Sequence, residues 1–167
     1  AVSDADRAVE EAARRTLGTA RPRDAVHGEE MDDTGWGARR WVIDPIDGTI
    51  NYACGIPLCC VSIGVEQHGE MILGAVYNPF INELFFAQKG FGASLNDKKI
   101  SVSKKTEVLH SCLVTGFPYT YLDMENGPLE VFERLVRKGV HVRRLGSAAI
   151  DLCWVAAGRF EGFFEHS

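Results

Sequence analysis

The sequence has no run of apolar residues long enough to cross a membrane, no CxxC pair and no excess of positive charge. A membrane-spanning helix needs about 20 consecutive apolar residues, so we expect no membrane partner. The net charge of −5 disfavours nucleic acid, which binds basic surfaces. The five cysteines are an odd number, and without CxxC spacing they indicate free thiols in a reducing cytoplasm, not a zinc site or a disulfide framework.

The chain also lacks an initial methionine, a visible signal peptide, internal repeats and low-complexity segments. The missing methionine is consistent with a lost start, so the absence of a signal peptide proves little. With 167 residues, 46% of them apolar and 25% charged, the composition is that of an ordinary globular protein with a single domain.

The first part of the chain, up to about residue 105, predicts one helix followed by a largely antiparallel sheet. Ser3 and Asp6 form a capping pair, apolar residues recur at helical spacing up to Leu17, and Gly18 ends the helix. A turn at 21–24 follows, and 67–70 is expected to join two strands as a hairpin. The predicted strands are 25–27, 41–43, 58–66, 71–77, 83–88 and 99–103.

The second part, from about residue 106, alternates between strands and helices and predicts an α/β arrangement. Pro128 starts one helix that ends at Lys138, and Ser147 caps another that ends near Ala157. A loop is expected over 118–127. The predicted strands are 112–117, 140–145 and 160–165.

The segment Trp41-Val42-Ile43-Asp44-Pro45-Ile46-Asp47-Gly48-Thr49 carries the chemistry that the sequence predicts. Pro45 is expected to end the apolar strand, so that Asp44 and Asp47 point to one place. Carboxylates crowded together repel, and a hard divalent cation such as magnesium relieves the conflict. The Gly48 and Thr49 N–H groups would bind a phosphate at a helix start. Alone, the segment is equally consistent with an ordinary aspartate turn that caps a helix.

Together with Gly28-Glu29-Glu30, this segment resembles the inositol monophosphatase family of magnesium-dependent, lithium-sensitive phosphatases. Two further passages resemble the same family. Gly90-Phe91-Gly92-Ala93 with Leu95-Asn96 resembles its glycine-rich hairpin. The segment from Arg144 through Gly158 to Glu165 resembles its substrate-side segment.

The resemblance implies a role for each acidic residue of the motif. Glu29, Asp44 and the Ile46 carbonyl would hold one magnesium ion, and Asp44 with Asp47 would hold a second. Glu29 and Thr49, with Asp47, would be the catalytic residues that orient and deprotonate the attacking water. Two or three Mg²⁺ ions are expected as cofactors, with Li⁺ as an inhibitor.

The resemblance also implies which residues bind the substrate: Gly48, Thr49, Gly146, Ser147, Ala148 and Glu165. Glu30 is given a supporting role near the site. His27 is left out, since a strand-edge histidine is more often structural. Asp151 is expected on a helix surface.

The fold implied by the resemblance is mixed α/β, a layered α/β/α/β/α sandwich of the inositol monophosphatase and fructose-1,6-bisphosphatase type. We expect residues 1–167 to form one incomplete phosphatase domain, because the family's Trp-Asp-x-Ala-Ala-Gly motif, with a further metal carboxylate, would follow Ser167, and its opening helix would precede Val2. The chain alone is therefore expected to be weakly active or inactive, and the full-length form to be a homodimer.

The predicted function is hydrolysis of inositol monophosphate or a similar small polyol phosphate by a metal-activated water. The enzymatic alternatives are a nucleotide 3′-phosphatase and a fructose-1,6-bisphosphatase of the same superfamily. The alternative from another class is a non-catalytic, truncated scaffold that acts in protein interactions.

Overall fold

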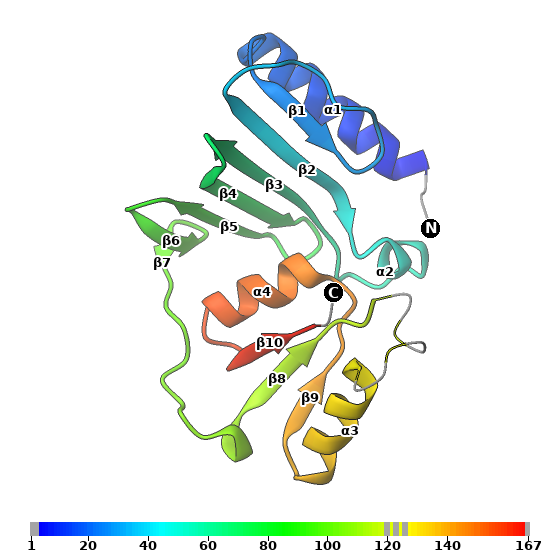
Figure 1. Ribbon diagram of the computed structural model, residues 1–167, viewed down its shortest axis with the longest axis vertical. Coiled ribbons are helices and arrows are strands. Elements are labelled where there is room, and N and C mark those ends of the chain that lie inside the picture. Colours follow the sequence, from blue (N-terminus) through cyan, green and yellow to red (C-terminus); the bar gives the residue numbers. More distant parts are fainter. Residues whose placement is uncertain (1–3, 119–120, 122–123, 125–126, 166–167) are drawn as a thin grey trace. The chain divides into compact units, whose positions relative to one another are not determined.

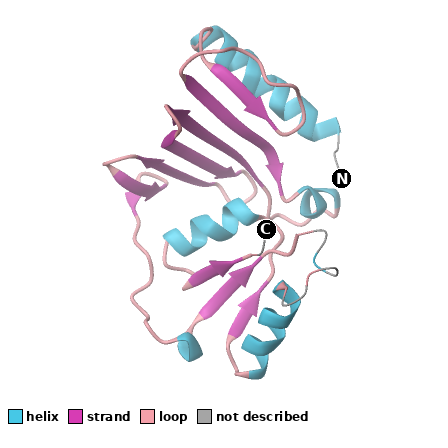
Figure 2. Cartoon of the chain, viewed as in Figure 1, coloured by secondary structure: helices cyan, strands magenta, loops and turns pink. Residues whose placement is uncertain are grey.

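The computed structural model describes residues 4–118, 121, 124 and 127–165, and the chain divides into two compact units, residues 1–99 and residues 100–167 (Figure 1). Strands predominate in the first unit, whereas strands and helices alternate in the second (Figure 2). The mixed α/β class expected from the sequence is confirmed. Each unit is described by itself below.

The first unit is built on a seven-stranded sheet whose strands follow one another in chain order. All neighbours are antiparallel except β1 and β2, which are parallel. The elements are α1 (Asp4–Ala20), β1 (Ala25–Gly28), β2 (Arg39–Asp47), α2 (Thr49–Ala53), β3 (Cys60–Gln67), β4 (Glu70–Asn78), β5 (Glu83–Gln88), β6 (Gly92–Leu95) and β7 (Lys98–Lys99). The meander arises because tight turns join successive strands, as at His68–Gly69, where both residues have positive φ.

Helix α1 is longer than the sequence predicts. It continues through Gly18 to Ala20, and the chain then turns at Arg21. A glycine near a helix end costs about 1 kcal/mol relative to alanine, which is too little to end a helix by itself. The predicted capping residue Ser3 lies outside the described residues.

Strand β2 continues past Pro45, although the sequence analysis expected Pro45 to end it. The register with β3 changes there: Asp44 lies opposite Ser62, and Asp47 lies opposite Cys60. Three steps along β2 therefore match two steps along β3, which is a β-bulge. A bulge accommodates proline because the missing N–H is not needed for the ladder at that point.

The prediction of a strand over 99–103 is also wrong. Strand β7 covers only Lys98–Lys99, and the chain from Ile100 to Glu107 has no regular structure. Asn96 and Asp97, both with positive φ, form the turn before it, and only Lys98 and Lys99 then pair with β6.

The second unit contains a three-stranded parallel sheet with the order β10-β8-β9. Its elements are the short 3₁₀ helix η1 (Val108–His110), β8 (Cys112–Thr115), α3 (Pro128–Arg137), β9 (His141–Arg143), α4 (Ala148–Ala156) and β10 (Gly162–Phe164). The helices therefore begin and end within one or two residues of the predicted positions. The predicted loop 118–127 falls partly on residues outside the described ones.

A buried carboxylate fixes the irregular segment 100–107 to the sheet of this unit. The Glu161 side chain is 7% exposed, accepts a hydrogen bond from the Cys112 N–H at 2.6 Å, and pairs with Lys105 at 3.3 Å. The Cys112 hydrogen bond is the largest cause of a lowered pKa of the Glu161 carboxyl, with Ser103 and Lys105 adding to it. The charged form of Glu161 is therefore stabilised by folding.

We expect Glu161 to contribute to stability near neutral pH and to lose that contribution in acid. Since its pKa is lower in the folded protein, the stabilisation is present above the ordinary value of about 4.5 and disappears as pH falls through the lower folded value. The Glu161→Gln variant should be less stable than the parent chain at pH about 7, and the difference should shrink towards pH about 3. Urea unfolding at several pH values measures this. Glu107→Gln, on an exposed side chain, is the control, and a difference that does not depend on pH would contradict the assignment.

No helix in the part of the chain that the structure describes has the length and apolar character needed to cross a membrane.

Candidate functional site

The parallel pairing of β1 and β2 brings Glu29 beside Asp44. The register places Gly28 opposite Ile43, so the next residue of each strand falls at the same level. The Glu29 N–H donates to the Ile43 carbonyl at 3.2 Å and extends the pairing by one residue. The Glu29 side chain is exposed and makes a hydrogen bond with the Asp44 carboxyl. The two strand ends therefore present their carboxyl groups to each other.

Asp44 is the centre of this acidic cluster. Burial, followed by the carboxylates of Asp47 and Glu29 and the hydrogen bond with Glu29, raises the pKa of Asp44 to about 7. Its Oδ1 atom is buried and has no hydrogen-bond partner among the residues that the structure describes. A buried carboxylate oxygen without a partner, beside two further carboxylates, is stabilised either by a proton or by a cation.

The turn after Asp47 brings the Thr49 hydroxyl to the Ile46 carbonyl of β2. Gly48 has φ 94°, a backbone conformation that glycine adopts without strain, and α2 begins at Thr49. The Thr49 hydroxyl donates to the Ile46 carbonyl at 3.1 Å. The hydroxyl oxygen of Thr49 thus keeps its lone pairs for a hydrogen bond from another donor, such as water.

A second contact fixes Asp47 from the opposite strand. The Cys60 thiol lies 3.8 Å from Asp47 Oδ2, and Cys60 is opposite Asp47 in the register. Cys59 and Cys60 are both buried. Burial, then Asp47 and Asp6, raises the pKa of the Cys59 thiol, so Cys59 remains neutral beside the acidic cluster.

The cluster offers oxygen donors of the kind that suit a hard divalent cation. Within residues 4–118, 121, 124 and 127–165, no three His, Cys, Asp or Glu side chains form a group arranged to hold a metal ion. The acidic side chains instead interact in pairs around Asp44. Magnesium is usually held by one or two carboxylates plus waters, so the Asp44 carboxylate with one neighbouring carboxylate and the Ile46 carbonyl is chemically suited to it.

Four residues of the expected substrate-binding set, Gly146, Ser147, Ala148 and Glu165, all belong to the second unit. Gly146 has φ 87°, and Ser147, which is 1% exposed, is the N-cap residue of α4 without a side-chain capping bond. Ala148 is the first residue of α4. Glu165 follows β10 and lies beside Gly116, where an added Cβ atom would overlap the Glu165 carboxylate. Its exposed carboxylate can accept hydrogen bonds from a polyol.

The hydrogen bonds of Glu30 and His27 are made with residues outside the acidic cluster. The Glu30 N–H donates to Glu10 Oε2 at 2.8 Å, and burial, then Asp6, Glu29 and Glu10, raises the pKa of the Glu30 carboxyl. His27 Nδ1 lies 2.6 Å from Asp33 Oδ1 on the surface. His27 therefore has a local partner on the surface.

Sequence reasoning placed Asp151 wrongly and missed two buried acids in α1. Asp151 is 1% exposed, not on a helix surface. Apart from Asp151, α4 contains only apolar residues and a cysteine, a composition typical of a largely buried helix, although Leu152 is 52% exposed. Asp6 and Glu10 are 2% and 0% exposed. They share one helical face with Ala13 and Leu17, but two acidic residues on that face give no sequence signal of burial, which depends on how α1 packs against the sheet.

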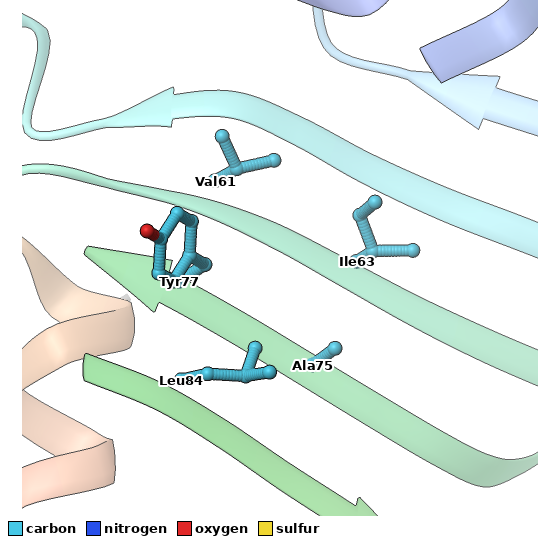
Figure 3. A pocket seen from close by; sticks show the side chains of 5 residues that line it. All are labelled: Val61, Ile63, Ala75, Tyr77 and Leu84. Atoms are coloured by element: carbon cyan, nitrogen blue, oxygen red, sulfur yellow. The ribbon is translucent and has the colours of Figure 1, made fainter. Parts of the chain in front are cut away.

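An apolar pocket on the sheet is separate from the carboxylate cluster. Its walls are Val61, Ile63, Ala75, Tyr77 and Leu84, which point to one face of β3, β4 and β5 (Figure 3). The register explains this, since Val61 pairs with Tyr77 and Tyr77 with Leu84. No charged side chain lines the pocket, so it does not suit a phosphate.

The model of the inositol monophosphatase family matches residues 1–167. The chain belongs to the inositol monophosphatase family. It is 39% identical over 166 residues to the inositol-1-monophosphatase of Rhizobium meliloti. The match covers 98% of this chain and 62% of that protein. It is 43% identical over 126 residues to the Nus factor SuhB of Pasteurella multocida, covering 75% of this chain and 47% of that protein.

Among solved structures, the inositol monophosphatase from Anabaena superposes with a TM-score of 0.93 at 39% identity. The superposition covers 99% of this chain and 67% of that one. This likeness confirms the fold type that the resemblance implied. The chain spans less than two thirds of the length of the Rhizobium relative.

Proposed function

We propose that this chain carries the metal-binding and substrate-side residues of a Mg²⁺-dependent phosphomonoesterase that acts on inositol monophosphate or a similar small polyol phosphate. The observation that carries the proposal is the meeting of Glu29 with Asp44, whose buried Oδ1 has no partner within the described part of the chain. Membership of the family and the name of the Rhizobium relative support the same reaction class.

Each member of the cluster has a distinct part in the proposed reaction. Asp44, Asp47, Glu29 and the Ile46 carbonyl would hold Mg²⁺, which supplies charge neutralisation at the phosphate and a more acidic water. Glu29, exposed at the end of β1, accepts a proton from the attacking water. The water oxygen bonds to phosphorus, the bond from phosphorus to the ester oxygen breaks, and that oxygen takes a proton from solvent and leaves as the alcohol.

Thr49 orients the water in this scheme. Because its own proton is donated to the Ile46 carbonyl, its oxygen is an acceptor for a water hydrogen. The Gly48 and Thr49 N–H groups are proposed to bind the phosphate. Gly146, Ser147, Ala148 and Glu165 are proposed to contact the polyol.

Three further proposals concern the whole protein. Li⁺ inhibits the reaction, and the enzyme forms a homodimer. Its free thiols, including buried Cys59 and Cys60, suit the reducing cytoplasm.

A phosphate-release panel tests the function. Inositol 1-phosphate, fructose 1,6-bisphosphate and 3′-phosphoadenosine 5′-phosphate are each compared with and without Mg²⁺, using this chain and a protein that spans the full length of the relatives. Release that depends on Mg²⁺ and is fastest with inositol 1-phosphate is the expected result. Preference for either other substrate would indicate the corresponding phosphatase, and no release by the longer protein would contradict an enzymatic role.

A non-catalytic role in protein interactions is the second candidate, because the Pasteurella relative is named a Nus factor. The two candidates differ in their dependence on the acidic cluster. An interaction that survives loss of Mg²⁺ and loss of the Asp44 charge would favour the second.

Glu165→Gln is expected to raise KM several-fold with little change in kcat, because Glu165 would contact bound substrate and not the metal ions. The comparison uses the longer protein with several polyol phosphates, and the exposed Glu107→Gln is the control. A fall in kcat at unchanged KM would place Glu165 in the chemical step instead.

A further inference from the structure

Helix α1 contains a fully buried carboxylate that the proposed reaction does not use. Glu10 is 0% exposed. Its Oε1 accepts a hydrogen bond from Arg14 Nε at 2.7 Å, and its Oε2 accepts one from the Glu30 N–H at 2.8 Å. A carboxylate removed from water in this way needs partners for both oxygens, and Glu10 has them.

Arg14 extends the contact along the connection between β1 and β2. Its guanidinium donates to Thr34 Oγ1 at 2.9 Å and to the Met31 carbonyl at 3.2 Å, in addition to Glu10. One turn of α1 therefore binds this connection at three points, Glu30, Met31 and Thr34. We call Glu10 and Arg14 together the α1 clamp.

The glycine at position 28 lets the Glu10 carboxylate of helix α1 come close to the end of β1. A Cβ atom added at Gly28 would overlap the Glu10 carboxylate. The glycine in Gly28-Glu29-Glu30 is therefore needed for close approach of helix α1 to the end of β1.

The clamp acts on one of the two peptide groups that flank Glu29. The Glu29 N–H is fixed by the Ile43 carbonyl at 3.2 Å, and the Glu30 N–H, on the other side, is fixed by Glu10. The Glu29 side chain itself is exposed. Its place beside Asp44 thus depends on the backbone that carries it.

We propose that Glu10 is a positioning residue that holds the Glu29 carboxylate beside Asp44 by fixing the backbone between Glu29 and Glu30, with Arg14 as its charge partner. The inference deepens the proposed function and rests on it, since Glu29 is a proposed metal ligand. A buried ion pair is weak evidence for a stabilising role, because apolar residues of similar volume are often as stable. A role in positioning Glu29 accounts both for the buried charge of Glu10 and for the glycine at position 28.

The test compares Glu10→Gln with Glu11→Gln, its exposed neighbour in the same helix. Glutamine keeps the shape of Glu10 but has one acceptor oxygen where two are required. Mn²⁺ binding is measured by electron paramagnetic resonance at a temperature where each variant is fully folded. Hydrogen exchange of the Glu30 amide is measured in the same samples without metal.

We expect Glu10→Gln to weaken Mn²⁺ binding by about 10-fold or more, as loss of residues behind metal ligands does, and to speed exchange of the Glu30 amide. Glu11→Gln should change neither. A role in helix packing alone would lower the unfolding temperature and leave the Mn²⁺ affinity of the folded protein unchanged, and that result would overturn the inference.

Gly28→Ala is the second variant, because its added methyl displaces the Glu10 carboxylate while every clamp residue is kept. It should weaken Mn²⁺ binding as Glu10→Gln does, and unchanged affinity would count against the clamp even if Glu10→Gln fails to fold.

Failure of the proposed function has a different signature. If the parent chain binds no Mn²⁺, the metal site is wrong, and the positioning role is decided by amide exchange. Unchanged protection of the Glu30 amide in Glu10→Gln would then overturn it.

Discussion

Asp44→Asn is expected to remove divalent metal binding and phosphatase activity together. The asparagine has the shape of the aspartate, but it lacks the negative charge and one of the two oxygens that metal ions share. Since Asp44 is the residue with which both Glu29 and Asp47 interact, no other single change should cost as much. We expect affinity for Mn²⁺ to fall on the order of 100-fold or more, above the range seen for residues behind the ligands.

Titration calorimetry with the chain measures the affinity, and phosphate release by a protein of the relatives' length measures turnover. Asp97→Asn, at an exposed turn position, is the matched control. The loss should not reflect unfolding. Burial and two carboxylates disfavour the charged form of Asp44, so a neutral amide there should leave the metal-free protein at least as stable. Near-normal turnover in Asp44→Asn would contradict the assignment.

Ile43→Ala is expected to give the largest loss of stability. Ile43 is 2% exposed and lies opposite Ile63 in β3 and Gly28 in β1. Shortening a buried isoleucine to alanine removes apolar contacts and leaves a cavity, at a cost of about 2–5 kcal/mol in the free energy of unfolding.

Urea unfolding followed by circular dichroism measures this change. Ile50→Ala removes the same atoms from a side chain that is 55% exposed and should cost less than about 1 kcal/mol. Equal losses in the two variants would mean that the junction of β1, β2 and β3 is not packed as described.

Local patterns were enough to predict most elements. The β-hairpins of the first unit and the helices after Pro128 and Ser147 follow from turn residues and from helical spacing, which act over a few residues. The errors at Gly18 and Pro45 have the opposite cause. Each residue disfavours the structure that it occupies by a modest amount, and packing of the helix or pairing of the strand outweighs this local preference.

The sequence by itself determined which residues carry charge, and the order Gly28-Glu29-Glu30 followed by Asp44 and Asp47 was enough to predict an acidic site. Only the tertiary structure decided that the two segments meet. The register of a parallel strand pair is set by contacts between distant residues, and no local pattern gives the pairing of Gly28 with Ile43. The same holds for Glu10, whose burial beneath Gly28 depends on where α1 packs against the sheet.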